Sequence, residues 1–203
     1  MHILSEEAVS GSKCIVFLEA AARTDETVGD KESWAWAQGQ LGFILCSPAY
    51  AAQNVARGLR HLRAAEPILS KGPPRANQCR FFLQLAAALT WALEVEAGLK
   101  AATRAMEIAE QLQDSERDYG LSFSASVLGR LLTVKGQLAE GFGWLEKGWE
   151  IADRINNTMA ASTAAWNAAN MYWGIGTRWK LKNGALVSWP ARAPRDHQPD
   201  GSS

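Results

Sequence analysis

The residues of this sequence that could carry chemistry are few and lie far apart along the chain. Its histidines are His2, His61 and His197, and its cysteines are Cys14, Cys46 and Cys79. The cysteines lack the Cys-x-x-Cys spacing of a zinc site or a disulfide framework, so three buried or half-buried thiols are expected. No Gly-x-Ser-x-Gly nucleophile turn and no His-Glu-x-x-His metal helix occurs. The sequence therefore indicates no catalytic residue, no metal site and no cofactor, and it predicts that the protein is not an enzyme.

Two short patterns resemble ligand-binding motifs but also have a structural interpretation. His61 lies within Arg57-Gly-Leu-Arg-His-Leu-Arg, where it is either a ligand or, as we expect, part of a solvated basic helix face. Gly141-Phe-Gly143 resembles a fragment of a phosphate-binding loop. It falls inside a predicted helix, however, where we expect both glycines to be small for packing.

Acidic residues at helical spacing are a third pattern of this kind. Glu146 and Glu150 share one helix face at i, i+4, as a catalytic pair of carboxylates would. Lys147 and Arg154 lie beside them, and neighbouring opposite charges are typical of an exposed helix surface. The exposed surface is the favoured interpretation.

The positions that could bind a ligand depend on the elements that hold them, and these elements repeat. When residues 128–155 are shifted back by about 43 positions, large residues fall on large ones and small residues fall on small ones. The matched pairs include Leu128 with Leu85, Leu132 with Leu89, Gly129 with Ala86, Gly141 with Gly98, and Gly148 with Ala105. Each unit contains two stretches with apolar residues at i, i+3, i+4 and i+7, which predicts two helices, and no stretch predicts a strand.

The repeat predicts an all-α protein with a domain at residues 1–176. Helix pairs are expected at about 31–70, 76–113 and 118–155, with unpaired helices at about 7–23 and 159–174. Turns are expected at Pro48, Gly72-Pro73-Pro74, Asp114-Ser115, Gly136 and Asn156-Asn157. The remaining residues, 177–203, are expected to form a disordered or loosely packed tail.

The order of large and small residues resembles the tetratricopeptide repeat. Leu-Gly followed by a large residue marks the first helix of that motif, and small, large and small residues mark the second. Residues 128–148 follow this order with Leu128-Gly129, Leu132, Gly141, Leu145 and Gly148. The resemblance implies an α-α superhelix, a TPR-like solenoid of antiparallel helix pairs in which the small residues let paired helices approach closely. Gly141 and Gly148 are therefore predicted to be small for packing, with leucine at position 141 destabilising and alanine near neutral or mildly stabilising.

Long units with acidic linkers resemble the repeat arrays of bacterial LuxR-type and ATPase regulators and of nucleotide-cyclase-associated regulators. This resemblance implies a non-catalytic protein–protein interaction module with a scaffold or regulatory role. The chain departs from the motif in its unit length, about 40–43 rather than the usual 34 residues, and in lacking the closing proline after the third pair. It begins and ends on helices without repeat partners, so we expect either a detached or truncated arm of a larger signalling or transcription regulator, or self-association through the open ends.

Aromatic and arginine residues are the candidates for binding, because such residues contribute most to interface energies. The repeat alignment places nine positions on the first helices, turned toward the concave groove. They are Trp36, Phe43, Arg80, Leu83, Phe123, Arg130, Trp166, Asn170 and Trp173. The expected ligand is a protein or peptide partner, and the alternative is a small-molecule effector held in the same groove. A structural role between helices is the third interpretation of these aromatic residues.

Composition and charge exclude several other classes. The 203 residues are 47% apolar and carry no net charge, which argues against a dedicated nucleic-acid-binding protein. Seven acids against three bases make residues 1–32 acidic, and five bases against two acids make residues 176–203 basic. The chain has neither a signal-peptide pattern at its start nor an apolar run that would span a membrane. We therefore expect a cytoplasmic protein without a membrane partner.

Overall fold

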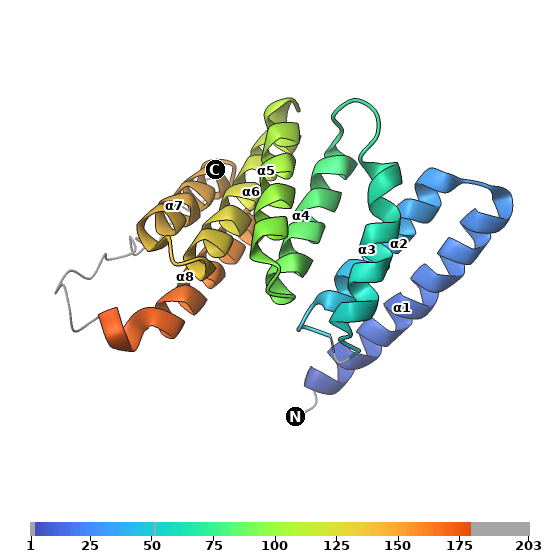
Figure 1. The fold of residues 1–203 in the computed structure, drawn as a ribbon, viewed down its shortest axis with the longest axis horizontal. Helices are drawn as coiled ribbons and strands as arrows, with labels where there is room; N and C mark the ends of the chain where they lie inside the picture. The colour runs from blue at the N-terminus through green and yellow to red at the C-terminus, as the bar shows by residue number, and fades with distance from the viewer. Residues whose placement is uncertain (1–2, 51, 180–203) are drawn as a thin grey trace, which may run out of the picture.

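The computed structural model describes residues 3–50 and 52–179, with side chains for 13–50, 52–169 and 171. Within these residues the chain forms eight helices and no strand, which confirms the prediction of an all-α protein (Figure 1). The helices are α1 (Ile3–Val28), α2 (Lys31–Cys46), α3 (Val55–Leu69), α4 (Ala76–Trp91), α5 (Val95–Glu110), α6 (Asp114–Val134), α7 (Leu138–Arg154) and α8 (Thr158–Trp179).

Side-chain caps and left-handed residues set the limits of several helices. Asp30 caps α2 by accepting a hydrogen bond from the Ser33 amide at 3.1 Å, and Asn54 caps α3 in the same way. Gly136, with φ of +92°, turns the chain between α6 and α7. These short connections fold each helix back beside the one before it.

Helix α6 begins earlier than the sequence suggested. Asp114 was expected in a turn before a helix at 118, yet it is the first residue of α6 and has a φ of +50°. Two acidic residues in the first turn favour this start, because they complement the partial positive charge of the helix N-terminus. Helix α8 continues past its expected end at about 174 to Trp179, so residues 177–179, which were assigned to the tail, are helical. The rest of the predicted tail lies outside the described residues.

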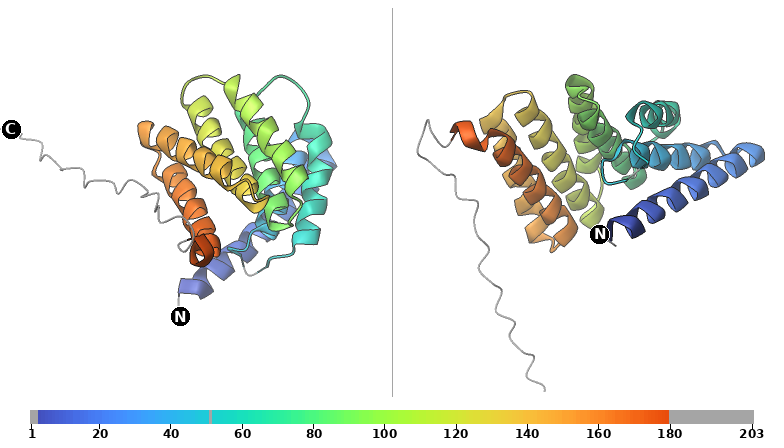
Figure 2. Two further views of the ribbon diagram at one scale, coloured as in Figure 1. Left: turned by 60° about the vertical axis from the view of Figure 1, so that its left-hand side comes forward. Right: turned by 90° about the horizontal axis from the view of Figure 1, so that it is seen from below.

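The helices pack mainly on their neighbours in the chain, and the largest contacts join α2 with α3, α4 with α5, and α6 with α7. Helix α2 also contacts α4, α4 contacts α6, and α6 contacts α8, whereas among the described residues α3, α5 and α7 do not contact one another. We call α2, α4, α6 and α8 the even-helix row. Helices α1 and α8 lie at opposite ends of the molecule (Figures 1 and 2).

Two of the helix pairs cross through glycines at close range. A β-carbon at Gly129 would lie 2.6 Å from the Gly141 carbonyl oxygen, and one at Gly141 would lie 2.7 Å from the Gly129 oxygen. The expectation that alanine is harmless at position 141 is therefore wrong, because its methyl group would meet backbone. Gly143 also differs from expectation, since a β-carbon there would have no neighbour within 4 Å. The packing role proposed for that glycine is wrong as well.

The sequence also predicted at least half-buried cysteines and no membrane-spanning helix. Cys46 and Cys79 are buried, and burial raises the pKa of both thiols to about 11. Cys14 is exposed on α1, contrary to the prediction that all three thiols are at least half-buried. No helix in the described part of the chain is long and apolar enough to cross a membrane.

Candidate functional site

Each of α2, α4 and α6 carries a stripe of aromatic, amide and basic side chains on the even-helix row. The members of a stripe are three, four, seven or eleven positions apart, and such positions lie on the same side of a helix. The stripes are Trp36, Gln40 and Phe43 on α2; Arg80, Gln84 and Trp91 on α4; and Tyr119, Phe123 and Arg130 on α6.

Direct side-chain contacts join the stripes of α2 and α4. The amides of Gln40 and Gln84 exchange two hydrogen bonds, each 3.1 Å long. The rings of Phe43 and Trp91 pack with their centroids 5.5 Å apart and their planes tilted by 39°. All four side chains are only partly buried, so these contacts bind the helices together and still leave surface available.

A second group of contacts joins α4 to α6. Tyr119 and Phe123 lie one turn apart on α6, and the centroids of their rings are separated by 4.6 Å. The guanidinium of Arg80 lies 5.9 Å from the centroid of the Tyr119 ring, within cation–π range. The Arg80 side chain is exposed and forms no ion pair with any residue that the structure describes, so its charge is available to a ligand.

Arg130 is the most unusual member of the stripes. Its Nε atom is buried and has no hydrogen-bond partner among the described residues. Burial lowers the pKa of its guanidinium, because removal from water disfavours the charged form. An unpaired, partly desolvated cation costs free energy that an incoming carboxylate would offset.

The structure distributes the sequence-predicted residues unevenly. Trp36, Phe43, Arg80, Phe123 and Arg130 lie on α2, α4 and α6, and all five side chains are at least partly exposed; their place in a binding groove stays a prediction. The side chain of Leu83 is only 8% exposed and packs in the core, so it is corrected from a surface contact to a core residue.

Three predicted residues fall on α8. Trp166 is 68% exposed, whereas Asn170 and Trp173 lie outside the residues whose side chains the structure describes. At the other end of the molecule, Phe17 on α1 is 72% exposed. Self-association through these two ends stays a prediction.

Four members of the stripes were not predicted from the sequence: Trp91, Tyr119, Gln40 and Gln84. Trp91 and Arg80 are eleven positions apart, and Tyr119 and Phe123 are four apart, so helical spacing alone could have found both aromatic residues. The Gln40–Gln84 pair could not have been found in this way. It depends on how far α2 and α4 are displaced along each other.

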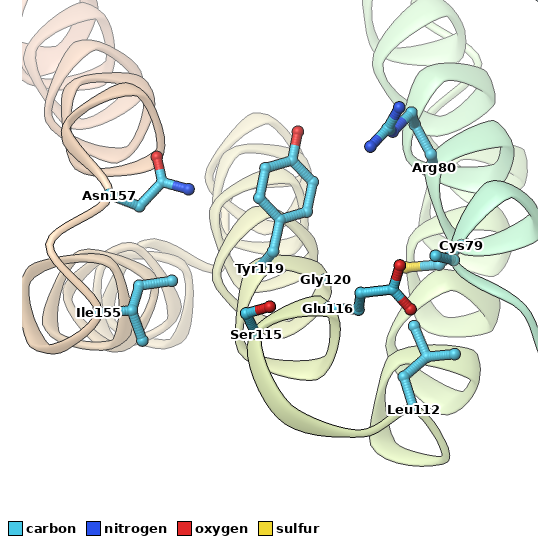
Figure 3. Close-up of a pocket in the computed structure, with 10 residues that line it drawn as sticks. Cys79, Arg80, Leu112, Ser115, Glu116, Tyr119, Gly120, Ile155 and Asn157 are labelled. Carbon is cyan, nitrogen blue, oxygen red and sulfur yellow. The ribbon is translucent and has the colours of Figure 1, made fainter.

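A cavity of about 310 Å³ lies beside the second group of contacts, between α4, the first two turns of α6, and the connections that precede α6 and α8 (Figure 3). Its lining residues are Ala76, Cys79, Arg80, Leu112, Ser115, Glu116, Tyr119, Gly120, Ile155 and Asn157. Arg80 and Tyr119 therefore belong both to the stripes and to this cavity.

The other residues considered for chemistry form no further site in the described part of the molecule. His61 is half-buried and hydrogen-bonded to the Gln38 side chain, so it is not the fully solvated histidine expected from the sequence. Burial, followed by the charges of Arg57 and Arg60, lowers the pKa of its imidazole. Glu146 is exposed on α7, as expected. Among the described residues, no group of three or more His, Cys, Asp or Glu side chains is placed to hold a metal ion.

Comparison with models of known protein families gave no match, and comparison with curated proteins gave none either.

Proposed function

We propose that the protein is a non-catalytic interaction module of the tetratricopeptide type, and that it binds an extended segment of a protein partner across the even-helix row. A scaffold or regulatory role in signalling or transcription is the setting that this proposal favours. The observation that carries it is the set of three stripes, whose partly exposed side chains contact one another from α2 to α6.

The repeat assignment is supported by two helix crossings built in the same way. In α2 and α3, a β-carbon at Gly42 would lie 2.7 Å from the Gly58 oxygen and 2.7 Å from Leu62 Cγ. In α6 and α7, a β-carbon at Gly129 would lie 2.6 Å from the Gly141 oxygen and 2.7 Å from Leu145 Cγ. The same small–small–large arrangement at two separate pairs is what a repeat requires.

The binding assignment is supported by the side chains that the row presents. Trp, Tyr and Arg contribute most to protein interfaces, because they bury large areas and make directed polar contacts. The row presents Trp36, Trp91, Tyr119, Arg80 and Arg130 on helices that are packed against one another. A rigid surface of this kind loses little conformational entropy when a partner binds.

The chemistry of the row also indicates what the partner segment contains. The two arginines, Arg80 and Arg130, favour at least one carboxylate, and for Arg130 a negative charge nearby would offset the cost of its desolvated guanidinium. The aromatic side chains favour large apolar residues beside that carboxylate. A segment that alternates acidic and apolar residues therefore fits best.

Selection from a random peptide library displayed on phage, with the purified protein as bait, tests this function. Selected peptides are expected to contain acidic and large apolar residues, and to bind Arg130→Gln and Trp36→Ala at least about tenfold more weakly than the wild type. Trp144→Ala is the matched control, because Trp144 lies on α7, outside the row. A selection that enriches no sequence, or peptides that bind all of these variants equally, would contradict the proposal.

A further inference from the structure

We propose that the cavity beside Tyr119 is a binding site for a small zwitterion, an α-amino acid with an apolar side chain. The cavity lies where α4, α6 and the start of α8 meet (Figure 3). Its volume of about 310 Å³ is at the lower end of the range for small-molecule pockets, which suits a ligand of amino-acid size.

Two opposite charges border this cavity without neutralising each other. Arg80 comes from α4 and Glu116 from the first turn of α6, and both side chains extend into the space between these helices (Figure 3). No ion pair joins them, and within the described residues no hydrogen bond or ion pair is recorded for Glu116. A ligand with one carboxylate and one ammonium group would pair with both.

Further polar groups around the cavity have hydrogen-bonding capacity left. The Oδ1 atom of Asn157 accepts the amide of Ala160 at 3.0 Å, so the two hydrogens of its side-chain nitrogen remain available. That nitrogen points toward Tyr119 (Figure 3). The hydroxyls of Tyr119 and Ser115 have no recorded partner among the described residues. The Tyr119 hydroxyl, on the side of the cavity where Arg80 lies, would complete the contacts to a ligand carboxylate held by Arg80, and the other donors are available to the remainder of the ligand (Figure 3).

The remaining lining is apolar and suits the side chain of the ligand. Leu112 and Ile155 line the cavity from the two connections, and Ala76 lines it from the start of α4. Burial raises the pKa of the Cys79 thiol to about 11, so this side chain is uncharged at neutral pH and adds to the apolar lining. Burying apolar ligand surface against these residues would add to the affinity.

The pairing of charges favours a free amino acid over the other ligands of similar size. A phosphate or a fatty carboxylate would satisfy Arg80 and leave Glu116 facing a like charge, and a simple amine would do the reverse. A terminal residue of a peptide carries either the backbone ammonium or the backbone carboxylate, but not both. The proposal therefore stands apart from peptide binding across the even-helix row, although Arg80 and Tyr119 take part in both surfaces.

Isothermal titration calorimetry with L-leucine, L-methionine and L-phenylalanine tests the proposal, with isocaproate and isoamylamine as analogues of leucine that each lack one charge. At least one amino acid is expected to bind wild-type protein. If leucine binds, each analogue should bind at least about tenfold more weakly. Absence of binding by all three amino acids, or equal binding of leucine and its analogues, would overturn the proposal.

Two variants, each of which removes one charge and keeps a polar side chain, assign the charges. Arg80→Gln should weaken leucine binding by about tenfold and abolish the preference for leucine over isoamylamine, because the carboxylate has lost its partner. Glu116→Gln should abolish the preference for leucine over isocaproate. Both residues are exposed, so these variants should remain folded, as circular dichroism would verify. If both variants bind leucine like the wild type, the cavity is not the site.

Two controls separate this site from other surfaces. Arg117→Gln on α6 and Glu146→Gln on α7 remove the same charges outside the cavity, and neither should alter amino-acid binding. Peptides selected on the even-helix row should bind Glu116→Gln normally, since Glu116 is not part of a stripe. Failure of the amino-acid site would thus leave the peptide results unchanged, and failure of the peptide selection would leave the titrations unchanged.

Discussion

The helix pairs α6/α7 and α4/α5 reach close packing by different means. In α6/α7 the two backbones meet at Gly129 and Gly141, and the large side chain of Leu145 fills the adjacent space. In α4/α5 the residue that corresponds to Gly129 is Ala86 and the one that corresponds to Leu145 is Ala102, and both are completely buried. The α6/α7 pair thus places a glycine, which has no side chain, beside a leucine, whereas α4/α5 has an alanine at each of the two positions.

The glycines of the second helices show the same contrast. A β-carbon at Gly141 would meet the backbone oxygen of Gly129 at 2.7 Å and the backbone nitrogen of Thr133 at 2.9 Å. A β-carbon at the corresponding Gly98 would meet only side chains, the nearest being Leu131 Cδ2 at 2.9 Å. A β-carbon at Gly98 would therefore press on a side chain of α6, which can move, and would lie at an ordinary 3.5 Å from Leu89 of its paired helix α4, whereas one at Gly141 would press on the backbone of its paired helix α6. Packing constrains the combined volume of facing residues rather than the identity of one residue.

The largest effect should come from Gly141→Leu. A leucine side chain at the closest point between α6 and α7 would force the two backbones apart, so the free energy of unfolding should fall by about 3 kcal/mol, the upper end of the range for overpacking. Chemical denaturation followed by circular dichroism measures this loss. Gly143→Leu, two residues further along α7 where a β-carbon has open space, should not lower the free energy of unfolding and should raise it by up to about 0.8 kcal/mol, because leucine is also favoured over glycine in a helix. Equal denaturation midpoints for the two variants would refute the close crossing of α6 and α7.

Enlarging residue 129 and shrinking residue 145 should make the packing of α6/α7 resemble that of α4/α5. Gly129→Ala brings a methyl group against Leu145 Cγ and the Gly141 oxygen, and Leu145→Ala alone leaves a cavity that costs about 2–5 kcal/mol. The double variant reproduces the Ala86–Ala102 combination of α4/α5. It should therefore be more stable than the sum of the single effects predicts, by about 1 kcal/mol.

The matched control for this swap uses the equivalent leucine of another pair. Leu62 is also completely buried, but it packs in α2/α3, away from Gly129. Gly129→Ala combined with Leu62→Ala should therefore give additive losses in the free energy of unfolding. If this combination shows the same coupling as Gly129→Ala with Leu145→Ala, the two methyl groups of α4/α5 do not compensate for each other.

Much of this packing was accessible from the sequence, because it recurs along the chain. The shift of 43 residues matched Gly129 to Ala86 and Gly141 to Gly98, and all four residues lie in tightly packed positions: Ala86 is completely buried, and a β-carbon at any of the three glycines would lie less than 3.0 Å from another atom. Apolar spacing also located the start of α2 and the end of α7 to within a residue, since the pairs expected at 31–70 and 118–155 begin and end there. Repetition amplifies a weak signal, since each helix supports the assignment of its counterparts.

Features that depend on how far neighbouring helices are displaced along each other could not be predicted from the sequence. Leu83 was assigned to the surface because the alignment gives only its side of the helix, and the closeness of its neighbours makes it a core residue. The cavity escaped prediction for a related reason. Leu112, Ile155 and Asn157 lie in connections between helices, and only the fold brings them near Tyr119.

The smallest expected effect distinguishes two glycines on one helix. Alanine is favoured over glycine in a helix by about 0.5–1 kcal/mol, so Gly143→Ala, with open space around it, should raise the free energy of unfolding by that amount. Gly141→Ala gains the same propensity but places its methyl group 2.7 Å from a backbone oxygen, and it should lower the free energy of unfolding by about 1 kcal/mol. Thermal and chemical denaturation of both variants measure the difference. Because the substitution and the helix are the same, only the distance to α6 differs, and equal stabilisation by both alanines would show that α6 and α7 do not meet backbone to backbone.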